Sequence, residues 1–267
     1  MTEELFNRTK LLLGKEGMER LASQRVIIFG VGGVGSWCAE CLVREGIMHL
    51  TLVDSDVVCP TNVNRQLMAT TKTIGEPKVE AMRRRLLEIN PEAEIVALQK
   101  KFSHDTVDDF CLETFDYIID AIDSLRDKIK LIVRATEKIP QPQTPQLPLG
   151  GAPILFSSMG AALRIDATKV RVSEFWKVKG DPLAAAMRSV MRRNKCFPAC
   201  KFLCVHSEEQ PLKNIGSALK DGSETFTKVQ TNGSLCHITA IFGMTLAGLV
   251  VNDIRQKTRE DLSGKGE

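Results

Sequence analysis

Four glycines near the N-terminus have a spacing that could hold phosphate groups. Gly30, Gly32 and Gly35 form the pattern G-x-G-x-x-G, and Gly33 lies between them. Glycine lets the backbone turn tightly, approach a phosphate closely and present amide N–H groups at a helix N-terminus. Asp54 follows the next apolar run, where a carboxylate can accept hydrogen bonds from a ribose. By itself, this fingerprint favours a dinucleotide such as NAD or FAD.

Polar residues after Asp54 favour ATP over a dinucleotide. Asp56 adds a second carboxylate, and it is followed by four candidate ligand residues, Asn62, Arg65, Gln66 and Lys78. A hydride-transfer enzyme does not need an arginine and a lysine here, whereas an enzyme that splits ATP between its α- and β-phosphates does. Arg65 and Lys78 could hold the triphosphate and neutralise the charge that develops on departing pyrophosphate.

A further acidic motif, Asp120-Ala121-Ile122-Asp123, ends another apolar run. Ligands of parallel α/β sheets bind beyond the carboxyl ends of the strands, so Asp123 is well placed to bind Mg²⁺. Each of these polar residues taken singly could equally form a surface ion pair. Their occurrence together and in this order favours a nucleotide site, with Arg65, Lys78 and Asp123 as its catalytic residues.

The segments that must position these residues alternate between strand and helix. Short apolar runs predict strands at residues 25–30, 49–54, 94–98 and 115–120. Helical patterns lie at residues 11–22, 35–45, 76–90, 105–113 and 128–138. This alternation predicts an α/β fold, a Rossmann-like and mostly parallel sheet with flanking helices.

The alternation stops at residues 139–153, which contain five prolines and two adjacent glycines and therefore cannot form a helix. We expect a single domain, 1–267, with an ATP-binding half (1–138), this proline-rich insertion and a substrate-facing half (154–267). The second half is predicted to contain strands at 154–158 and 170–175, a helix at 182–193, a cysteine-bearing loop and an apolar helix at 235–251.

Taken together, these motifs resemble those of the ubiquitin-activating (E1-like) superfamily over residues 8–135. They are GxGGxGS, DxD, NxxRQ, a lysine further along and DAxD. The resemblance implies an E1-like adenylation domain. In it, Gly32, Gly33 and Gly35 lie against ATP, and Asp54 holds the ribose. The same resemblance implies that the phosphates and Mg²⁺ are bound by Asn62, Arg65, Lys78 and Asp123.

Arg8, in the sequence F-N-R-T-K, resembles the arginine that members of this superfamily extend across a dimer interface. There it reaches the ATP of the partner subunit. The resemblance therefore implies a homodimer in which Arg8 completes the neighbouring site.

Short motifs in the second half resemble the branch of the superfamily that acts on tRNA, the threonylcarbamoyladenosine dehydratases. They are S-S-M-G-A (157–161), R-I-D-A-T-K-V (164–170), D-P-L (181–183), M-R (187–188) and S-E-E (207–209). The resemblance implies ATP-dependent activation of a carboxylate on the modified adenosine beside the anticodon, followed by ring closure with net loss of water. Because ring closure is intramolecular, no catalytic cysteine is required, and Cys236 is expected to lie in the core.

The alternative is an enzyme that adenylates the C-terminus of a ubiquitin-like sulfur carrier, usually with two zinc-binding CxxC pairs. The chain lacks such pairs, since Cys38-Ala39-Glu40-Cys41 is expected to be buried in the helix after the glycines. The cluster Cys196, Cys200, Cys204 and His206 has a spacing unusual for zinc, and its metal binding stays open. A non-catalytic E1-like binding module and a nicotinamide dehydrogenase are both disfavoured by Arg65, Lys78 and Asp123.

The net charge of +3 does not by itself indicate nucleic acid binding, but one stretch is strongly basic. Residues 183–206 contain no acidic residue and five basic ones, Arg188, Arg192, Arg193, Lys195 and Lys201. They are expected either to contact the anticodon arm of tRNA or to form a solvated face. A sulfur-transfer protein or cysteine desulfurase is a further candidate partner.

Composition indicates a soluble protein of ordinary type, with 43% apolar and 26% charged residues. Eight cysteines in a chain of this length do not form a disulfide scaffold, and no signal peptide is visible, so we expect a reduced, cytoplasmic protein. Residues 235–251 are just long enough to span a membrane. A buried core helix is the favoured interpretation, with peripheral membrane association left open.

Overall fold

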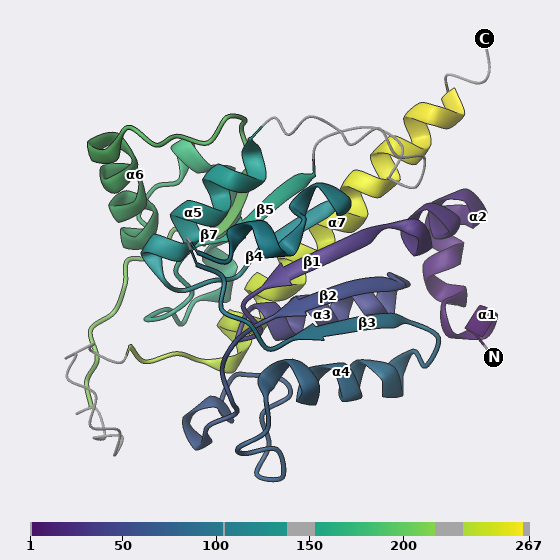
Figure 1. Ribbon diagram of the computed structural model, residues 1–267, viewed down its shortest axis with the longest axis horizontal. Helices are drawn as coiled ribbons and strands as arrows, with labels where there is room; N and C mark the ends of the chain where they lie inside the picture. Colours follow the sequence, from purple (N-terminus) through teal and green to yellow (C-terminus); the bar gives the residue numbers. More distant parts are fainter. Residues whose placement is uncertain (1, 104, 138–152, 217–231, 264–267) are drawn as a thin grey trace.

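A single seven-stranded sheet forms the centre of the computed structural model, which describes residues 2–103, 105–137, 153–216 and 232–263 (Figure 1). Its strands are β1 (Arg25–Phe29), β2 (His49–Val53), β3 (Glu94–Leu98), β4 (Tyr117–Asp120), β5 (Ile154–Ser158), β6 (Val170–Glu174) and β7 (Leu203–Ser207). Their order is β3-β2-β1-β4-β5-β7-β6, and all neighbouring strands are parallel except β6, which is antiparallel to β7. The predicted Rossmann-like, mostly parallel sheet is therefore confirmed.

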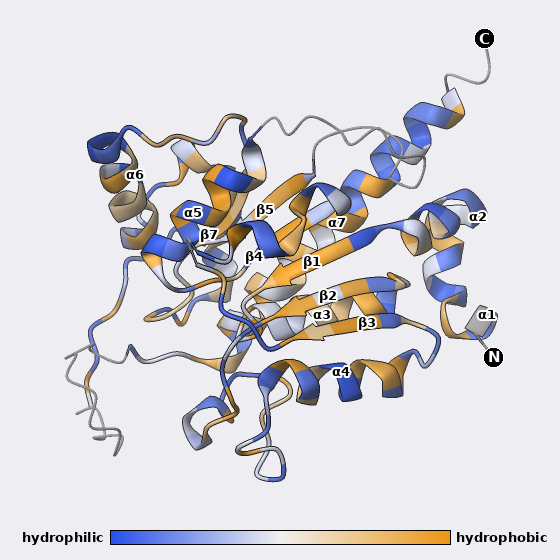
Figure 2. Ribbon diagram, in the orientation of Figure 1, coloured by the Kyte–Doolittle hydropathy of each residue, from blue (hydrophilic) through white to orange (hydrophobic). Residues whose placement is uncertain are grey.

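Helices cover both faces of this sheet. They are α1 (Thr2–Leu5), α2 (Asn7–Ser23), α3 (Gly35–Glu45), α4 (Lys78–Ile89), α5 (Leu125–Thr136), α6 (Pro182–Asn194) and α7 (Cys236–Ser263). One apolar core lies between the sheet and α3, α4 and α7, and the other between the sheet and α5 and α6. The central strands are hydrophobic along most of their length, as expected for strands covered on both faces (Figure 2).

The predicted helix at 105–113 is wrong. Two short 3₁₀ turns, Val107–Phe110 and Leu112–Thr114, take its place. Cys111 separates them with a φ of 44°, a left-handed conformation that an α-helix cannot continue through. Val107, Phe110 and Leu112 are nevertheless buried in a core beneath the sheet. The apolar spacing that suggested a helix therefore arises from this packing.

The predicted cysteine-bearing loop is also wrong in part, because residues 203–207 form strand β7 between β5 and β6. Along this strand, Cys204 packs into one apolar core and Val205 into the other. Successive side chains of a strand point to opposite faces, so both faces of β7 are buried. The apolar run F-L-C-V (202–205) is thus typical of a strand that is buried on both faces.

Helix α7 is a core helix, in agreement with the favoured interpretation of its sequence. Ile238, Phe242, Leu246 and Val250 lie at helical spacing in the core that α7 shares with α3. Gly243 permits this contact, because a Cβ atom there would lie 2.4 Å from the carbonyl oxygen of Val34. Within the described residues, α7 alone is long and apolar enough to cross a membrane, and half of its most apolar window is buried inside the protein.

Candidate functional site

The glycine loop joins the end of β1 to the start of α3, at the carboxyl edge of the sheet. A Cβ atom on Gly30 would lie 2.6 Å from the carbonyl oxygen of Ala121, and one on Gly35 would lie 1.8 Å from that of Gly30. Gly33 is less crowded, since a Cβ there would lie 3.1 Å from a side-chain atom of Thr239 on α7. Gly30 and Gly35 are therefore required by the packing of the backbone itself.

Gly32 is different, because no protein atom would be crowded by a Cβ added there. The nearest atom to a Cβ on Gly32 would be Nε2 of Gln66, at 3.8 Å. Gln66 is only 6% exposed, and its Oε1 has no hydrogen-bond partner within the described part of the chain. Buried polar groups are normally paired, so an uncrowded position next to an unpaired amide oxygen fits a bound polar ligand. Gly32 and Gln66 thus outline a cradle of the kind that ATP could occupy.

Replacing Gly32 by alanine tests this interpretation. We expect Gly32→Ala to keep its free energy of unfolding within about 0.5 kcal/mol of the wild type, because no protein atom is crowded. ATP binding should weaken by about tenfold or more, since the new methyl group occupies the cradle. Titration of ATP by calorimetry and urea denaturation measure the two effects. Gly248→Ala is the control, because Gly248 lies on α7 with no atom within 4 Å of the added Cβ. Unchanged ATP affinity in Gly32→Ala would contradict the assignment.

Asp54 connects the end of β2 to the glycine loop. Its carboxylate accepts hydrogen bonds from the backbone N–H groups of Val31, at 2.8 Å, and Asp56, at 2.9 Å. Burial raises the pKa of the Asp54 carboxyl, and the Lys78 ammonium acts in the opposite direction. A carboxylate has about four acceptor positions, so Asp54 can still receive hydroxyl groups of a ribose.

Lys78 is held beside these carboxylates at the first turn of α4. Its Nζ lies 2.7 Å from Oδ2 of Asp56, and its side chain is 8% exposed. The backbone N–H of Lys78 also donates to the carbonyl oxygen of Asp56, at 3.0 Å. The lysine is therefore fixed at both ends, with its charge next to Asp54 and Asp56.

Arg65 and Asp123 come from different loops, and their charges are close enough to interact. Burial lowers the pKa of the Arg65 guanidinium, and the Asp123 carboxylate counteracts that effect. Arg65 donates through Nη1 to the Thr61 carbonyl oxygen, at 2.8 Å, and its own carbonyl oxygen accepts from Nε1 of Trp37, at 3.1 Å. Asp123 is exposed. The pair thus presents opposite charges at an accessible point of the site.

Asn62 positions the turn that carries Arg65. Its Oδ1 accepts a hydrogen bond from the backbone N–H of Cys59, at 3.0 Å. Its carbonyl oxygen accepts from the backbone N–H groups of Arg65 and Gln66, at 3.1 and 2.9 Å. The side-chain oxygen of Asn62 is therefore engaged in building the loop.

A buried ion pair beneath Asp123 was missed by the sequence analysis. Lys128 Nζ lies 2.9 Å from Oδ2 of Asp120, and both side chains are completely buried. Asp120 also accepts from Ser157 Oγ, at 2.6 Å, and from the backbone N–H of Ile122, whose carbonyl oxygen accepts from Lys128. These contacts fix the backbone that leads to Asp123. The motif D-A-I-D contained Asp120, but nothing in the spacing singled out Lys128.

Arg8 lies away from the site of its own subunit. It is exposed on α2, which packs where α3 ends, since a Cβ on Gly46 would contact Phe6, Met18 and Leu21 (Figure 1). The glycine loop lies at the other end of α3, a helix of 11 residues. Any action of Arg8 on a nucleotide therefore requires a second subunit.

The cysteines do not form a metal site among the described residues, where no group of three or more His, Cys, Asp or Glu side chains is arranged to hold a metal ion. Cys38 is buried and Cys41 half-buried, as expected for structural residues, and burial raises the pKa of Cys41 to about 12. The expectation for Cys236 is wrong: it is exposed at the start of α7, and Ile238 begins the buried stripe.

The separate short motifs of the second half come together at the carboxyl ends of β5 and β7. Asp181 accepts from the backbone N–H groups of Gly160, at 3.1 Å, and Ala184, at 2.9 Å, and lies 3.8 Å from the buried Arg164 guanidinium. Glu209 accepts from two backbone N–H groups of the R-I-D-A-T-K-V segment, both at 3.0 Å. Residues far apart in the sequence thus build one cluster beside the nucleotide half.

The basic stretch lies at the opposite edge of the sheet. Helix α6 begins at the carboxyl edge beside Gly160, and the segment after it returns to the start of β7. Thirteen residues of α-helix span about 20 Å, so its last turn is far from the glycine loop. Arg188 is tied to the Phe175 carbonyl oxygen, at 3.1 Å. The remaining four basic residues are exposed and lack an acidic partner within the described residues, namely Arg192, Arg193, Lys195 and Lys201.

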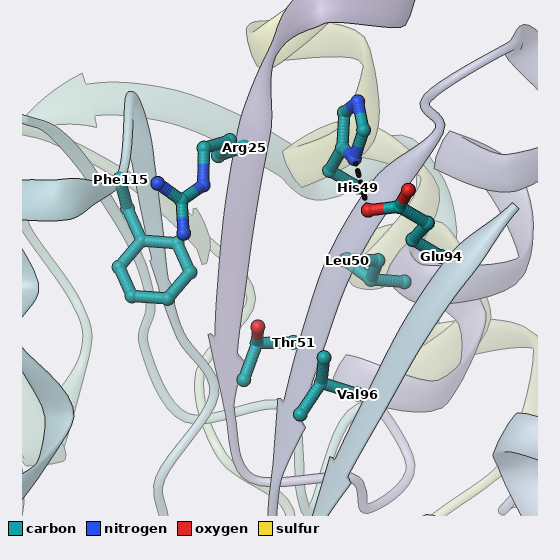
Figure 3. Close-up of a pocket in the computed structure, with 7 residues that line it drawn as sticks. All are labelled: Arg25, His49, Leu50, Thr51, Glu94, Val96 and Phe115. Carbon is teal, nitrogen blue, oxygen red and sulfur yellow. Dashed lines mark hydrogen bonds and ion pairs between the residues drawn. The ribbon is translucent and has the colours of Figure 1, made fainter. Parts of the chain in front are cut away.

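A shallow pocket on β1, β2 and β3 also lies away from this site (Figure 3). It is lined at the starts of the strands by Arg25, His49 and Glu94, with His49 Nδ1 3.0 Å from Glu94 Oε2. Ligands of parallel α/β sheets bind at the carboxyl edge, where the four glycines and Asp123 converge. The candidate site is therefore the carboxyl edge, and not this pocket.

Comparison with known proteins identifies the family of the chain. The family model described as the ThiF family matches residues 6–265. The chain is 34% identical over 253 residues to "tRNA threonylcarbamoyladenosine dehydratase" of Bacillus subtilis (strain 168), covering 93% of this chain and 94% of that protein. It is also similar to the crystal structure of E. coli tRNA N6-threonylcarbamoyladenosine dehydratase, TcdA, in complex with ATP. The TM-score is 0.79 and the sequence identity 30%, and the match covers 96% of each chain. "Molybdopterin-synthase adenylyltransferase" of Escherichia coli (strain K12) is 40% identical, but over only 34% of this chain and 37% of that protein.

Proposed function

The chain belongs to the ThiF family, and we propose that it is an ATP-dependent tRNA threonylcarbamoyladenosine dehydratase. One observation carries this proposal. The similarity to the dehydratases extends across both halves of the chain, whereas the similarity to the molybdopterin-synthase adenylyltransferase covers about a third of it. The cluster built around Arg164, Asp181 and Glu209 lies in the second half of the chain, and the similarity to the dehydratases, at 93% of this chain, extends over both halves.

The nucleotide half supports binding of ATP. Gly32 and Gln66 leave a polar cradle, and Asp54 keeps acceptor positions free for the ribose. Arg65 and Lys78 are the cations beside it, with Asn62 on the same loop as Arg65 and Asp56 bound to Lys78. Helix α3 begins at Gly35, and the N-terminus of a helix favours phosphate binding. We assign these residues to ATP, with Gly30 and Gly35 shaping the loop.

Asp123 is the residue that we assign to Mg²⁺. Magnesium in phosphate-transfer sites is usually held by one or two carboxylates together with phosphate oxygens and water. A single exposed carboxylate fits that pattern, and no group of three or more His, Cys, Asp or Glu side chains forms a closed cage among the described residues. When bound, the ion would neutralise charge on the phosphates, and the protein's own contribution is to hold Asp123 in place through Asp120 and Lys128.

The proposed reaction has two steps. A carboxylate oxygen of the modified adenosine attacks the α-phosphorus of ATP, and the bond to the β-phosphate breaks so that pyrophosphate leaves. A nucleophile of the same modified group then attacks the activated carbonyl carbon and loses its proton to solvent, and the bond from that carbon to the AMP oxygen breaks. AMP carries this oxygen away, so the nucleoside is lighter by one water although no free water is released. Arg65 and Lys78 stabilise the first step, because two anions must approach each other and negative charge grows on the leaving group.

The alternative function is adenylation of a ubiquitin-like sulfur carrier. The two functions are separated by measuring AMP and pyrophosphate formation with tRNA or with a carrier protein that ends in glycine. We expect tRNA that contains threonylcarbamoyladenosine to stimulate product formation and the carrier to have no effect. The opposite pattern would replace the dehydratase proposal by the alternative.

The basic stretch is proposed to contact tRNA phosphates. We expect the double variant Arg192→Glu/Arg193→Glu to weaken tRNA binding and to flatten its salt dependence, because each lost phosphate contact lowers the slope of log K against log salt by about 0.9. Filter binding at several salt concentrations measures both quantities. ATP affinity should be retained. Arg255→Glu/Arg259→Glu is the matched control, since these two arginines are exposed on α7. An unchanged salt slope in the first variant would show that the stretch is only a solvated face.

We also propose a homodimer in which Arg8 of one subunit serves the ATP of the other. Arg8→Ala and Asp123→Ala should each be inactive alone. Mixing the two should restore part of the activity, because one site of the mixed dimer then has an intact Asp123 and an intact Arg8. Steady-state AMP formation after subunit exchange measures this recovery. Absence of recovery, with exchange confirmed by labelled subunits, would mean that Arg8 does not act across an interface.

A cytoplasmic location is the one that we infer for a tRNA-modifying enzyme. Peripheral membrane association through α7 stays a prediction. So does a partner protein that is a cysteine desulfurase or another sulfur-transfer protein. The burial of α7 against α3 favours a structural role for its apolar face.

A further inference from the structure

Two aromatic side chains lie exposed side by side next to the last turn of α6. Trp176 is 37% exposed and Phe197 is 48% exposed, and their ring centroids are 6.2 Å apart. The guanidinium of Arg192 lies 5.8 Å from the centroid of the Trp176 ring, close enough for a cation–π contact. We call Trp176, Phe197 and Arg192 the aromatic patch.

The core does not explain why these rings are exposed. Phe175 and Phe202 already fill the apolar space beneath them, stacked with centroids 5.1 Å apart and nearly completely buried. Trp176 contacts Phe175 only edge to face, at 5.2 Å. An exposed pair of large aromatic side chains beyond a complete core indicates a surface that binds something.

The charge around the patch limits what that ligand can be. Arg192 and Arg193 end α6, where cations are favourable in any protein because of the helix dipole. Lys195 and Lys201 lie beyond the helix and are also exposed, and none of the four has an acidic partner among the residues described. A flat apolar platform surrounded by free cations is suited to an unpaired nucleobase and the phosphates that flank it.

We propose that the aromatic patch stacks an unpaired base of the RNA substrate. The inference rests on the proposed function for the identity of the RNA and adds how and where the RNA is held. Because α6 spans about 20 Å between the Asp181 cluster and its last turn, the RNA contacts the protein at two separated places. The reacting nucleotide lies at the carboxyl edge of the sheet, and the stacked base lies at the opposite edge.

The two tryptophans allow a direct test, because Trp37 lies at the glycine loop and Trp176 in the patch. In a Trp37→Phe variant, the fluorescence of Trp176 should be quenched on adding tRNA transcript or an RNA hairpin with a single-stranded loop. A blunt RNA duplex of equal charge should not quench it. In a Trp176→Phe variant, ATP should change the remaining Trp37 signal. Equal signals with hairpin and duplex, or no quenching by either, would overturn stacking.

Conservative variants test the energetic contribution of the rings. Trp176→Leu/Phe197→Leu keeps apolar side chains, and we expect it to lower affinity for the hairpin about tenfold or more, with an unchanged salt slope. Trp176→Phe/Phe197→Tyr keeps the rings and should bind as the wild type does. Wild-type affinity in the leucine variant would overturn the proposal. So would a Trp176 signal that changes with protein concentration alone, because the patch would then be an interface between two copies.

The outcome also distinguishes this inference from the proposed function. If tRNA stimulates AMP formation while the leucine variant binds RNA normally, the aromatic patch is excluded and the dehydratase activity stands. If the hairpin quenches Trp176 and the leucine variant binds weakly, but tRNA fails to stimulate AMP formation, RNA stacking stands and the dehydratase proposal is wrong.

Discussion

Asp123→Ala is expected to remove nearly all ATP turnover and to leave the fold intact. Asp123 is exposed and forms no buried contact with the described residues, so its removal should change the free energy of unfolding by less than about 0.5 kcal/mol. It follows the carboxyl end of β4, where charge on the phosphates must be stabilised, and its carboxylate raises the pKa of the Arg65 guanidinium against the effect of burial. Loss of one such electrostatic group lowers kcat by about 10²–10³-fold.

Pyrophosphate release at saturating ATP and Mg²⁺ measures the effect of Asp123→Ala, with circular dichroism to check the fold. Asp108→Ala is a suitable control, because this carboxylate is 82% exposed and lies on a 3₁₀ turn outside the site. The control should release pyrophosphate at the wild-type rate. A folded Asp123→Ala protein with near-normal turnover would remove Asp123 from the mechanism.

Lys128→Met is expected to give the largest loss of stability in the site. The variant leaves the Asp120 carboxylate completely buried without its cation, and the Ile122 carbonyl oxygen without its donor. Removing one partner of a buried ion pair costs about 3–5 kcal/mol. Urea denaturation measures the free energy of unfolding, and Asp120→Asn/Lys128→Met should recover part of the loss because the uncompensated charge is gone.

Lys130→Met provides the matched control on the same helix, since Lys130 is only half-buried and has no buried carboxylate beside it. It should stay within about 0.5 kcal/mol of the wild type. A loss of less than about 1 kcal/mol in Lys128→Met would be typical of a surface pair and would contradict the interpretation of Asp120 and Lys128 as a buried support.

The first half of the fold could be predicted from the sequence because buried parallel strands are continuous apolar runs. Strands β3 and β5 have the predicted bounds, and β1, β2 and β4 differ by one or two residues. Strand β7 was missed because Cys204 and His206, which lie on it, were interpreted as possible metal ligands. The position of β7 between β5 and β6 cannot be predicted from its own residues, because both neighbouring strands are distant in the sequence.

Residues of the candidate site could be predicted only where they belong to a recognisable sequence motif. The glycines, Asp54, Arg65, Lys78 and Asp123 follow strands in the order that this sheet requires, and the structure brings them to one edge. Lys128 could not be predicted, because on a helix it looks like any solvated lysine until the fold buries it against Asp120. The pairing of Trp176 with Phe197 likewise depends on β6 returning beside β7.

The central claim is dehydration of threonylcarbamoyladenosine in tRNA. The most direct measurement is mass spectrometry of nucleosides from tRNA that carries this modification, after incubation with the protein, ATP and Mg²⁺. We predict that the modified nucleoside loses the mass of one water, only with ATP present and not with Asp123→Ala. Unchanged nucleoside in the presence of a folded, ATP-binding wild-type protein would contradict the account.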